Sequence, residues 1–219
     1  MISSNELIDA LGIIAILIPS VIVHEVAHGW VAERFGDPTA RDAGRITLNP
    51  VPHIDPLGSV ILPGMLALAG QNVFGWAKPV PVNPRFFRRP TESMAIVALA
   101  GPATNLAVAL LVGRLGPFHE SRGVACLGDT VCLTSLSTFS RVLLAILVVN
   151  AALAVFNMLP IPPLDGSRLL PLVLSDRGKM LYHRVSQYGF IILFVLLFVF
   201  RGSLSFVGDV IAWVVGVLV

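Results

Sequence analysis

The stretch VIVHEVAHGW, residues 21–30, decides the fold because it sets two histidines and a glutamate inside an apolar run. The run extends from about Leu7 to Phe35, and at ~1.5 Å per residue such a helix is longer than the ~30 Å hydrocarbon core of a bilayer. Burying Asp, Lys or Arg at that depth costs ~2.5–3.5 kcal/mol, so Glu25 there requires a compensating partner. The stretch therefore predicts a membrane-spanning helix that carries a polar site.

The composition of the whole chain is that of an integral membrane protein. Of its 219 residues, 55% are hydrophobic and only 13% are charged, and the mean hydropathy is +0.84, whereas soluble domains carry about 25% charged residues. A net charge of +2 is too small to suggest nucleic-acid binding, and the basic residues lie in loops between apolar runs. No cleaved signal is expected, because the first apolar run lacks a basic leading segment.

The pattern of apolar runs predicts an all-α polytopic membrane protein with about five to six transmembrane helices. Residues 56–76 form an apolar segment broken by Pro63-Gly64, which either crosses the membrane or re-enters it. Short alternating segments at residues 45–48 and 78–82 predict proline-limited β-strands in a cytoplasmic loop. The later spans are predicted at residues 93–112, 142–159, 187–200 and 204–219.

Basic residues are unevenly distributed among the loops. The positive-inside rule places the loops richest in Lys and Arg in the cytoplasm, which favours a re-entrant element at residues 56–76. Arg201 fits this topology less well, because it lies beside the outer end of the predicted span at residues 187–200. The loops predicted to be cytoplasmic hold Arg34, Arg41, Arg45, Lys78, Arg85, Arg88, Arg89, Arg168, Arg177, Lys179 and Arg184, whereas the loop between residues 112 and 142 holds only Arg114, Arg122 and Arg141.

The polar triplet of the first helix has the spacing of a metal site. His24 and His28 lie four residues apart, so on a helix their rings project from one face. With Glu25 they form an HExxH motif, in which two imidazoles bind zinc and the glutamate acts as a general base. The alternative is a set of hydrogen-bonded core residues, and lipid disfavours it because few partners are available there.

A catalytic zinc ion needs three protein ligands and an open position. The acidic candidates near the apolar runs are Asp9, Asp165 and Asp209. Asp165 stands in NMLPIPPLDG, residues 157–166, where three prolines forbid an uninterrupted helix. The predicted topology puts Asp165 and His28 toward the same cytoplasmic leaflet. A simple helix-ending turn is the other interpretation of Asp165.

Taken together, HExxH, NxxPxPxLDG, the GPATN of residues 101–105 and the loop NPVPHIDPLG of residues 49–58 resemble the site-2 protease family of intramembrane zinc metalloproteases. The resemblance spans residues 20–170 and implies hydrolysis of peptide bonds within or near the transmembrane segments of membrane-protein substrates. It assigns one Zn²⁺ to His24, His28 and Asp165, and the catalytic base to Glu25. It also implies one domain over residues 1–219, with a catalytic core at about 7–175 and C-terminal helices at about 180–219, and no PDZ or CBS module is expected.

The sequence leaves the roles of several residues open. Asn157 and Asn105 are candidate donors to the oxyanion that develops during hydrolysis, or they form interhelical hydrogen bonds. His53 either orients a ligand or lies at an interface, and Asp209 has no assigned role. Cys126 and Cys132 form a disulfide or remain free thiols.

A metal transporter, or another metal-binding membrane protein without proteolytic activity, is the main alternative function. Transport predicts ligands that recur along a path through several spans, whereas here they cluster once and include Glu25. The expected location is the cell membrane, with a multi-pass chain and the active site toward the cytoplasm. The natural substrate and the oligomeric state are left open.

Overall fold

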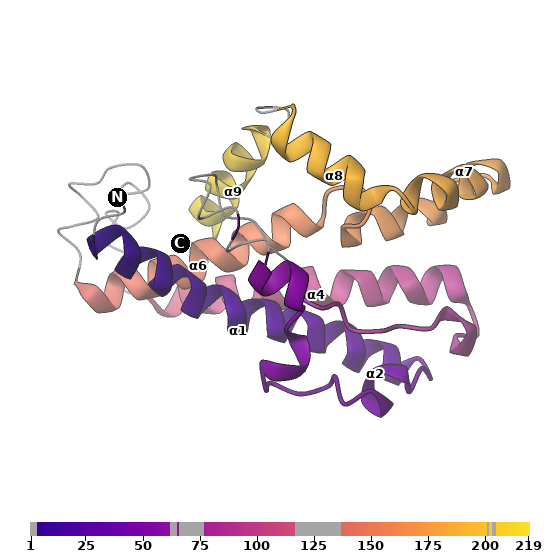
Figure 1. Cartoon of the computed structure of the whole chain (residues 1–219), viewed down its shortest axis with the longest axis horizontal. Coiled ribbons are helices and arrows are strands. Elements are labelled where there is room, and N and C mark those ends of the chain that lie inside the picture. Colours follow the sequence, from indigo (N-terminus) through magenta and orange to yellow (C-terminus); the bar gives the residue numbers. More distant parts are fainter. Residues whose placement is uncertain (1–3, 62–64, 66–76, 117–136, 201, 203–204) are drawn as a thin grey trace.

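The computed structural model describes residues 4–61, 65, 77–116, 137–200, 202 and 205–219, and most of these lie in helices (Figure 1). Helix α1 (Ser4–Arg34) carries the HExxH motif and ends where Gly36 adopts a left-handed φ of 100°, a conformation that favours glycine. A short helix α2 (Thr39–Asp42) follows, then the 3₁₀ turn η1 (Val51–His53) and the π-helical turn η2 (Pro56–Ile61).

Helix α4 (Pro90–Leu115) lies at the centre of the molecule and packs against α1 and against α6 (Thr138–Asn157). It runs antiparallel to both, so the end of α1, the start of α4 and the end of α6 meet on one side (Figure 1). Small residues allow close packing on α4: Ala109 is fully buried, and a Cβ on Gly113 would lie 3.5 Å from Cδ1 of Leu147 on α6 and 2.6 Å from the carbonyl oxygen of Leu218 near the C-terminus. The three helices form the scaffold that positions the polar residues.

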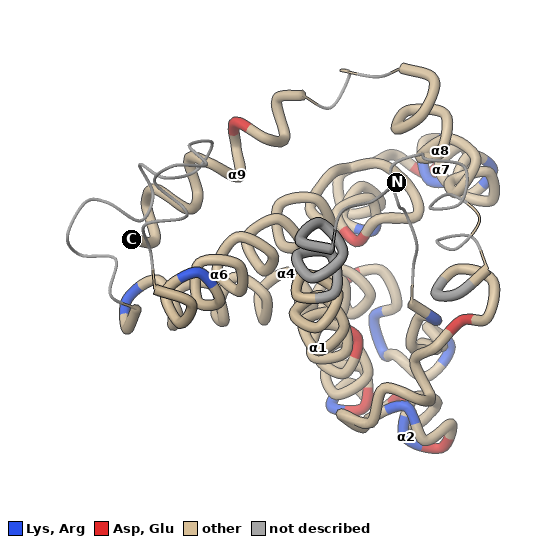
Figure 2. The backbone as a smooth tube through the Cα atoms, turned by 60° about the vertical axis from the view of Figure 1, so that its left-hand side comes forward, with Lys and Arg blue, Asp and Glu red and all other residues tan. Residues whose placement is uncertain are grey.

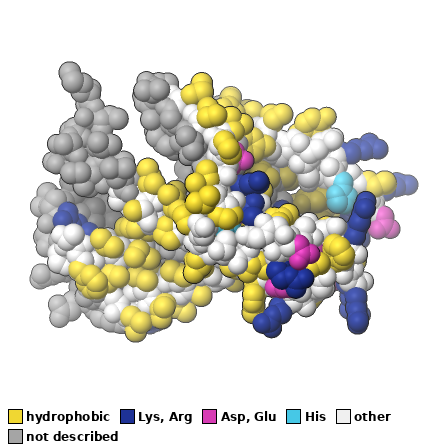
Figure 3. Space-filling model, turned by 60° about the horizontal axis from the view of Figure 1, so that its bottom comes forward, with side chains coloured by type: hydrophobic (Ala, Val, Ile, Leu, Met, Phe, Trp, Pro, Cys, Tyr) yellow, Lys and Arg dark blue, Asp and Glu magenta, His cyan; other side chains and the backbone are white. Residues whose placement is uncertain are grey.

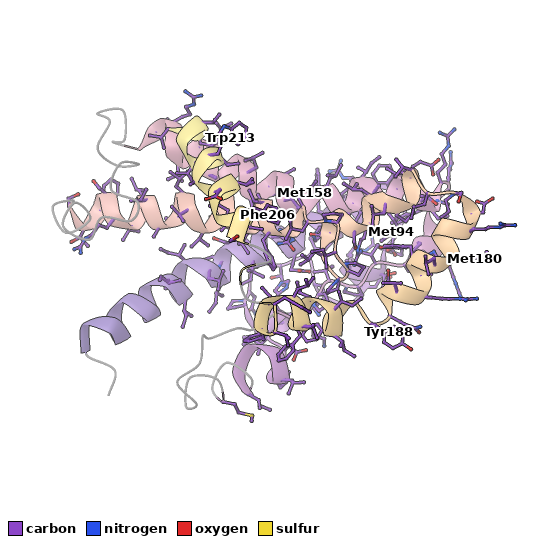
Figure 4. The ribbon with its side chains drawn as sticks, turned by 90° about the horizontal axis from the view of Figure 1, so that it is seen from above. Met94, Met158, Met180, Tyr188, Phe206 and Trp213 are labelled. Carbon is purple, nitrogen blue, oxygen red and sulfur yellow. The ribbon has the colours of Figure 1, made fainter. Side chains whose placement is uncertain are left out.

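The C-terminal third is a series of shorter helices. The 3₁₀ segment η4 (Asp165–Leu172) packs against α4 and α7 (Asp176–Ser186), and α7 leads into α8 (Gly189–Phe198) through a bend of 67°. Helix α9 (Ser205–Leu218) returns to pack on α6 and α4. Its Phe206 and Trp213 are exposed (Figure 4).

The distribution of side chains is inverted relative to a soluble protein. Large apolar residues such as Ile13 and Leu111 are exposed, whereas polar residues such as Asn150 are buried. Among the residues that the structure describes, three helical segments are long and apolar enough to cross a membrane: Gly12–Arg34, Pro90–Leu115 and Thr138–Asn157. The bent pair α7 and α8 could make a fourth. A helical membrane protein is thus confirmed, whereas five to six spans are not, and residues 62–64 and 66–76 of the predicted re-entrant segment lie outside the description.

The two predicted β-strands are not confirmed, although the structure describes both segments. Residues 46–48 form bends, and residue 45 and residues 77–83 have no regular secondary structure. Pro79 and Pro81 offer no backbone N–H to a neighbouring strand, and the N–H of Val80 donates to a side chain. Cys126 and Cys132 lie outside the described residues, so the structure does not bear on their pairing.

Most charged residues gather at one end of the molecule. Figure 2 shows Lys, Arg, Asp and Glu concentrated around α2 and around α7, and the face in Figure 3 carries most of its dark-blue side chains toward the same end. The spans between are almost free of charge, apart from the site described next.

Candidate active site

Three ligand atoms converge at the point where α1, α4 and η4 meet. The Nε2 atoms of His24 and His28 lie 3.0 Å apart, and each lies 3.1 Å from Oδ2 of Asp165. All three side chains are buried. Within the described part of the chain they form a group that could hold a metal ion, so the fold unites residues separated by 137 and 141 positions.

The second nitrogen of each imidazole is held by an acceptor. Nδ1 of His28 donates to the Val97 carbonyl oxygen at 2.7 Å, and Nδ1 of His24 donates to Oδ1 of Asn105 at 2.6 Å. Because both acceptors require a proton on Nδ1, a neutral imidazole has a lone pair on Nε2. Both lone pairs therefore face the Asp165 carboxylate.

Such a cluster of acceptors requires a cation. A single proton shared among the three atoms relieves only part of the repulsion between them. A divalent metal satisfies all three atoms at once. Ligand atoms around a tetrahedral zinc ion lie about 3.3 Å apart, and the three separations of 3.0–3.1 Å match one face of that tetrahedron with little adjustment.

Gly101 of α4 makes room for the two histidines. A Cβ at this position would lie 2.5 Å from Nε2 of His24 and 2.5 Å from Nε2 of His28. These distances are far below van der Waals contact, so only glycine allows α4 to approach the cluster this closely. Steric contact with the two histidines therefore explains why a glycine stands at this position of the GPATN segment.

Glu25 lies beside the cluster and is held by the extended segment at residues 77–83. Its Oε2 accepts a hydrogen bond of 2.7 Å from the Val80 backbone N–H. Arg45, which is buried, donates to the carbonyl oxygens of Lys78 and Pro79. Asp37, also buried, accepts from the Asn83 N–H at 2.6 Å. Two buried side chains that follow α1 thereby fix the segment that contacts Glu25.

The proline-rich turn after α6 brings Asp165 back to α4. Gly166 sits against the end of α6, where an added Cβ would lie 2.1 Å from the Met158 carbonyl oxygen. Ser167 donates to the Leu164 carbonyl oxygen at 2.7 Å and closes the turn. The turn and η4 therefore hold the carboxylate at a fixed distance from α1.

The other predicted site residues lie in different surroundings. Asn105 is fully buried, and both its donors are used, toward Asn150 Oδ1 at 2.8 Å and the Ser20 carbonyl oxygen at 3.3 Å. This geometry favours a role for Asn105 in orienting the His24 ring, and it leaves no Asn105 donor for an oxyanion. Asn157 is half-buried at the end of α6 and donates to Leu153 of its own helix. Nε2 of His53 donates to the Thr47 carbonyl oxygen at 3.0 Å, and Asp209 is exposed on α9.

Comparison with known proteins agrees with this geometry. The model of Peptidase family M50 matches residues 118–200. YwhC of Bacillus subtilis, named as a candidate zinc metalloprotease, is 38% identical over 187 residues, which cover 85% of this chain and 80% of YwhC. Rip2 of Mycolicibacterium smegmatis, named in the same way, is 33% identical over 84% of this chain and 66% of its own length.

Rip2 of Mycobacterium tuberculosis H37Rv is also 33% identical, over 84% of this chain and 65% of its own length. No solved structure matches the chain. The similarity to YwhC covers far more of the sequence than the family model does, and it agrees with the HExxH and LDG motifs at the cluster. On this evidence the chain belongs to peptidase family M50, the site-2 protease family.

Proposed function

We propose that the protein is an intramembrane zinc endopeptidase that hydrolyses peptide bonds within or near the transmembrane segments of other membrane proteins. Membership of family M50 supports the reaction class. One observation carries the assignment of the site: the lone pairs of His24 and His28 and the carboxylate of Asp165 converge within 3.0–3.1 Å at membrane depth. At ~1.5 Å per residue, His24 lies about 15 Å from the end of α1.

The proposed ligands are His24, His28 and Asp165, around one Zn²⁺. Bound zinc would supply a charge that lowers the pKa of a water molecule and polarises the scissile carbonyl. Glu25 accepts the proton of the attacking water and returns it to the leaving amine. The Val80 N–H keeps one Glu25 oxygen fixed, which leaves the other oxygen for proton transfer.

We assign different roles to the two predicted oxyanion donors. Asn157 keeps the proposed role, because its amide bonds only to its own helix and can rotate toward a substrate. Asn105 is assigned to orienting His24, since its donors are both used and its side chain is fully buried. The first residue would contact the substrate and the second would not.

The proposed location is the cell membrane, with the active site opening toward the cytoplasm. The support is the distribution of charge: α2 and α7, which carry Arg41 and Arg177, lie at one end of the molecule (Figure 1), whereas Arg114 in the last turn of α4 and Arg141 in the first turn of α6 belong to the other. Loops rich in Lys and Arg stay on the cytoplasmic side. The membrane-protein substrate itself is not specified by these residues.

Metal transport is less well supported. A transport path needs ligands at several depths, whereas the described residues contain one group of three metal-ligating side chains. A proton-accepting carboxylate fixed beside that group, as Glu25 is, serves hydrolysis and has no function in transport.

Replacing Glu25→Gln tests the proposal directly. We expect the full chain in membranes to retain its zinc and to lose at least about 100-fold in cleavage of a co-expressed membrane substrate, because only the base is removed. Glu33→Gln is the matched control, since it makes the same change on α1 at a residue paired with Arg41 on the surface, and it should cleave normally. Cleavage that survives in Glu25→Gln, or metal flux that changes in place of cleavage, contradicts the proposal.

A further inference from the structure

A chain of buried hydrogen bonds leads away from the candidate zinc site. It links His24 and Ser20 of α1 through Asn105 of α4 and Asn150 of α6. The exposed fractions are 5% for His24, 9% for Ser20, 0% for Asn105 and 1% for Asn150. Three helices thus contribute to a polar network that lies entirely inside the membrane-spanning part.

The far end of the chain fixes the orientation of the Asn150 amide. The Ser20 hydroxyl donates to the Ile16 carbonyl oxygen at 2.8 Å, so its oxygen accepts from Nδ2 of Asn150 at 3.0 Å. The second hydrogen of Nδ2 points to the Ile146 carbonyl oxygen at 2.9 Å. Because a carbonyl can only accept, rotating the amide by 180° would lose the bond to Ile146 and would force the Ser20 hydroxyl to turn away from the Ile16 carbonyl oxygen. Oδ1 of Asn150 must therefore face Asn105.

The orientation of the Asn150 amide in turn fixes the orientation of the Asn105 amide. Its Nδ2 donates to Oδ1 of Asn150 and to the Ser20 carbonyl oxygen, so Oδ1 of Asn105 must face Nδ1 of His24. Nδ1 then carries the proton and Nε2 carries the lone pair. If the Asn105 amide were reversed, its NH₂ group would require an unprotonated Nδ1, the proton would move to Nε2, and that nitrogen could not bind a metal.

We infer that Asn150, supported by Ser20, selects through Asn105 the tautomer and ring orientation in which His24 can bind zinc. Neither Asn150 nor Ser20 touches the ligand atoms, so both are positioning residues. His28 needs no such device, because its Nδ1 donates to the backbone carbonyl of Val97, which cannot exchange donor for acceptor. The inference rests on the proposed role of His24 as a zinc ligand.

The test compares two replacements at one position in the purified full chain. Asn150→Leu removes the acceptor for Asn105, and we expect zinc affinity, measured by chelator competition, to fall by about 10- to 100-fold, the usual effect of losing a partner that orients a ligand. Asn150→Asp keeps an oxygen toward Asn105 and should stay within a few-fold of the wild type. Ser20→Ala should cost about threefold, the size of an average interhelical hydrogen bond in a membrane.

Two further measurements separate positioning from general packing. Nitrogen-15 NMR of histidine-labelled, metal-free protein should show one histidine of Asn150→Leu moving to the tautomer with the proton on Nε2. The unfolding temperature of the metal-free variants should not follow their zinc affinity. Thr104→Val is the control: it removes a hydroxyl from α4 whose bond, to the Ala100 carbonyl oxygen, stays within that helix, and its zinc affinity should equal that of the wild type.

The possible outcomes have distinct meanings. If Asn150→Leu binds zinc as tightly as the wild type, or if Asn150→Asp is as weak as Asn150→Leu, the inference is wrong. If Asn150→Leu does not fold, an unchanged zinc affinity and tautomer in Ser20→Ala overturns it. If the wild type binds no zinc, or if His24→Ala leaves its affinity unchanged, the proposed function fails instead.

Discussion

Gly101 is the residue at which the smallest change should have the largest effect on the site. In Gly101→Ala the added Cβ would lie 2.5 Å from both ligand nitrogens, so either the histidines or α4 must move. We expect zinc affinity to fall at least about tenfold, because ligand orientation is lost. The measurement is zinc content and chelator competition on the purified variant.

The control for Gly101 is Gly208→Ala on α9. This glycine has no heavy atom within 4 Å of an added Cβ, so the same change meets no neighbour. Zinc affinity and cleavage should equal those of the wild type, and α9 should be slightly favoured because alanine has the higher helix propensity. Equal zinc binding by Gly101→Ala and Gly208→Ala would show that α4 does not constrain the ligands.

The two histidines could be named as candidate metal ligands from the sequence, whereas the residues that we infer to orient them could not. His24 and His28 follow from the spacing of four on a helix, and Asp165 follows from its proline-rich context and its family resemblance. Asn150 lies 45 residues from its partner Asn105 and 130 from Ser20, and no periodicity encodes such a link. The signal for Asn150 is an amide in the middle of an apolar run, where a polar group needs a partner, but an amide is not a usual zinc ligand and does not by itself indicate a role at the metal site.

At the scale of the elements, a change in the extended segment at residues 77–83 should impair the proposed base, Glu25, without changing zinc binding. Val80→Pro removes the N–H that donates to Glu25. Hydrogen bonds to charged groups contribute about 1.5–3 kcal/mol, so we expect turnover to fall about tenfold or more with zinc content unchanged. Single-turnover cleavage of a membrane substrate by the purified variant is the measurement.

Val80→Ala separates the backbone from the side chain at that position. It keeps the N–H but removes the methyl groups that pack on Gly29, where an added Cβ would lie 3.0 Å from Cγ1 of Val80. Turnover of Val80→Ala should remain within about threefold of the wild type, because the hydrogen bond to Glu25 persists. A loss as large as that of Val80→Pro would assign the effect to packing.

The helices could be predicted more closely than the segments between them. The predicted spans at residues 93–112 and 142–159 lie within or near α4 (Pro90–Leu115) and α6 (Thr138–Asn157), because a long apolar run in a bilayer can satisfy its backbone only as a helix. The alternating residues at 78–82 pointed to a strand. There the prolines and the contacts with Arg45 and Glu25 determine the backbone instead, and such contacts depend on tertiary structure.

At the scale of the whole molecule, the inverted distribution of side chains explains how a hydrolase works within lipid. Exposed residues such as Leu111 and Trp213 face outward, where lipid replaces water as the solvent. The polar groups face inward and satisfy one another across α1, α4 and α6. The proposed zinc ligands are thereby held by helices in a medium that offers no competing hydrogen bonds.

The orientation of the molecule in the membrane provides the last prediction. After Cys126 and Cys132 are replaced by serine, single cysteines are introduced as Arg41→Cys, beyond the end of α1, and Thr138→Cys, at the start of α6. Both residues are exposed and lie at opposite ends of the spans. Because the arginine-rich end should be cytoplasmic, a membrane-impermeant maleimide should label Thr138→Cys in intact cells and Arg41→Cys only in opened membranes. The reverse pattern would put the zinc site nearer the outer face, and variants that still cleave substrate would establish that the labelled protein is the active form.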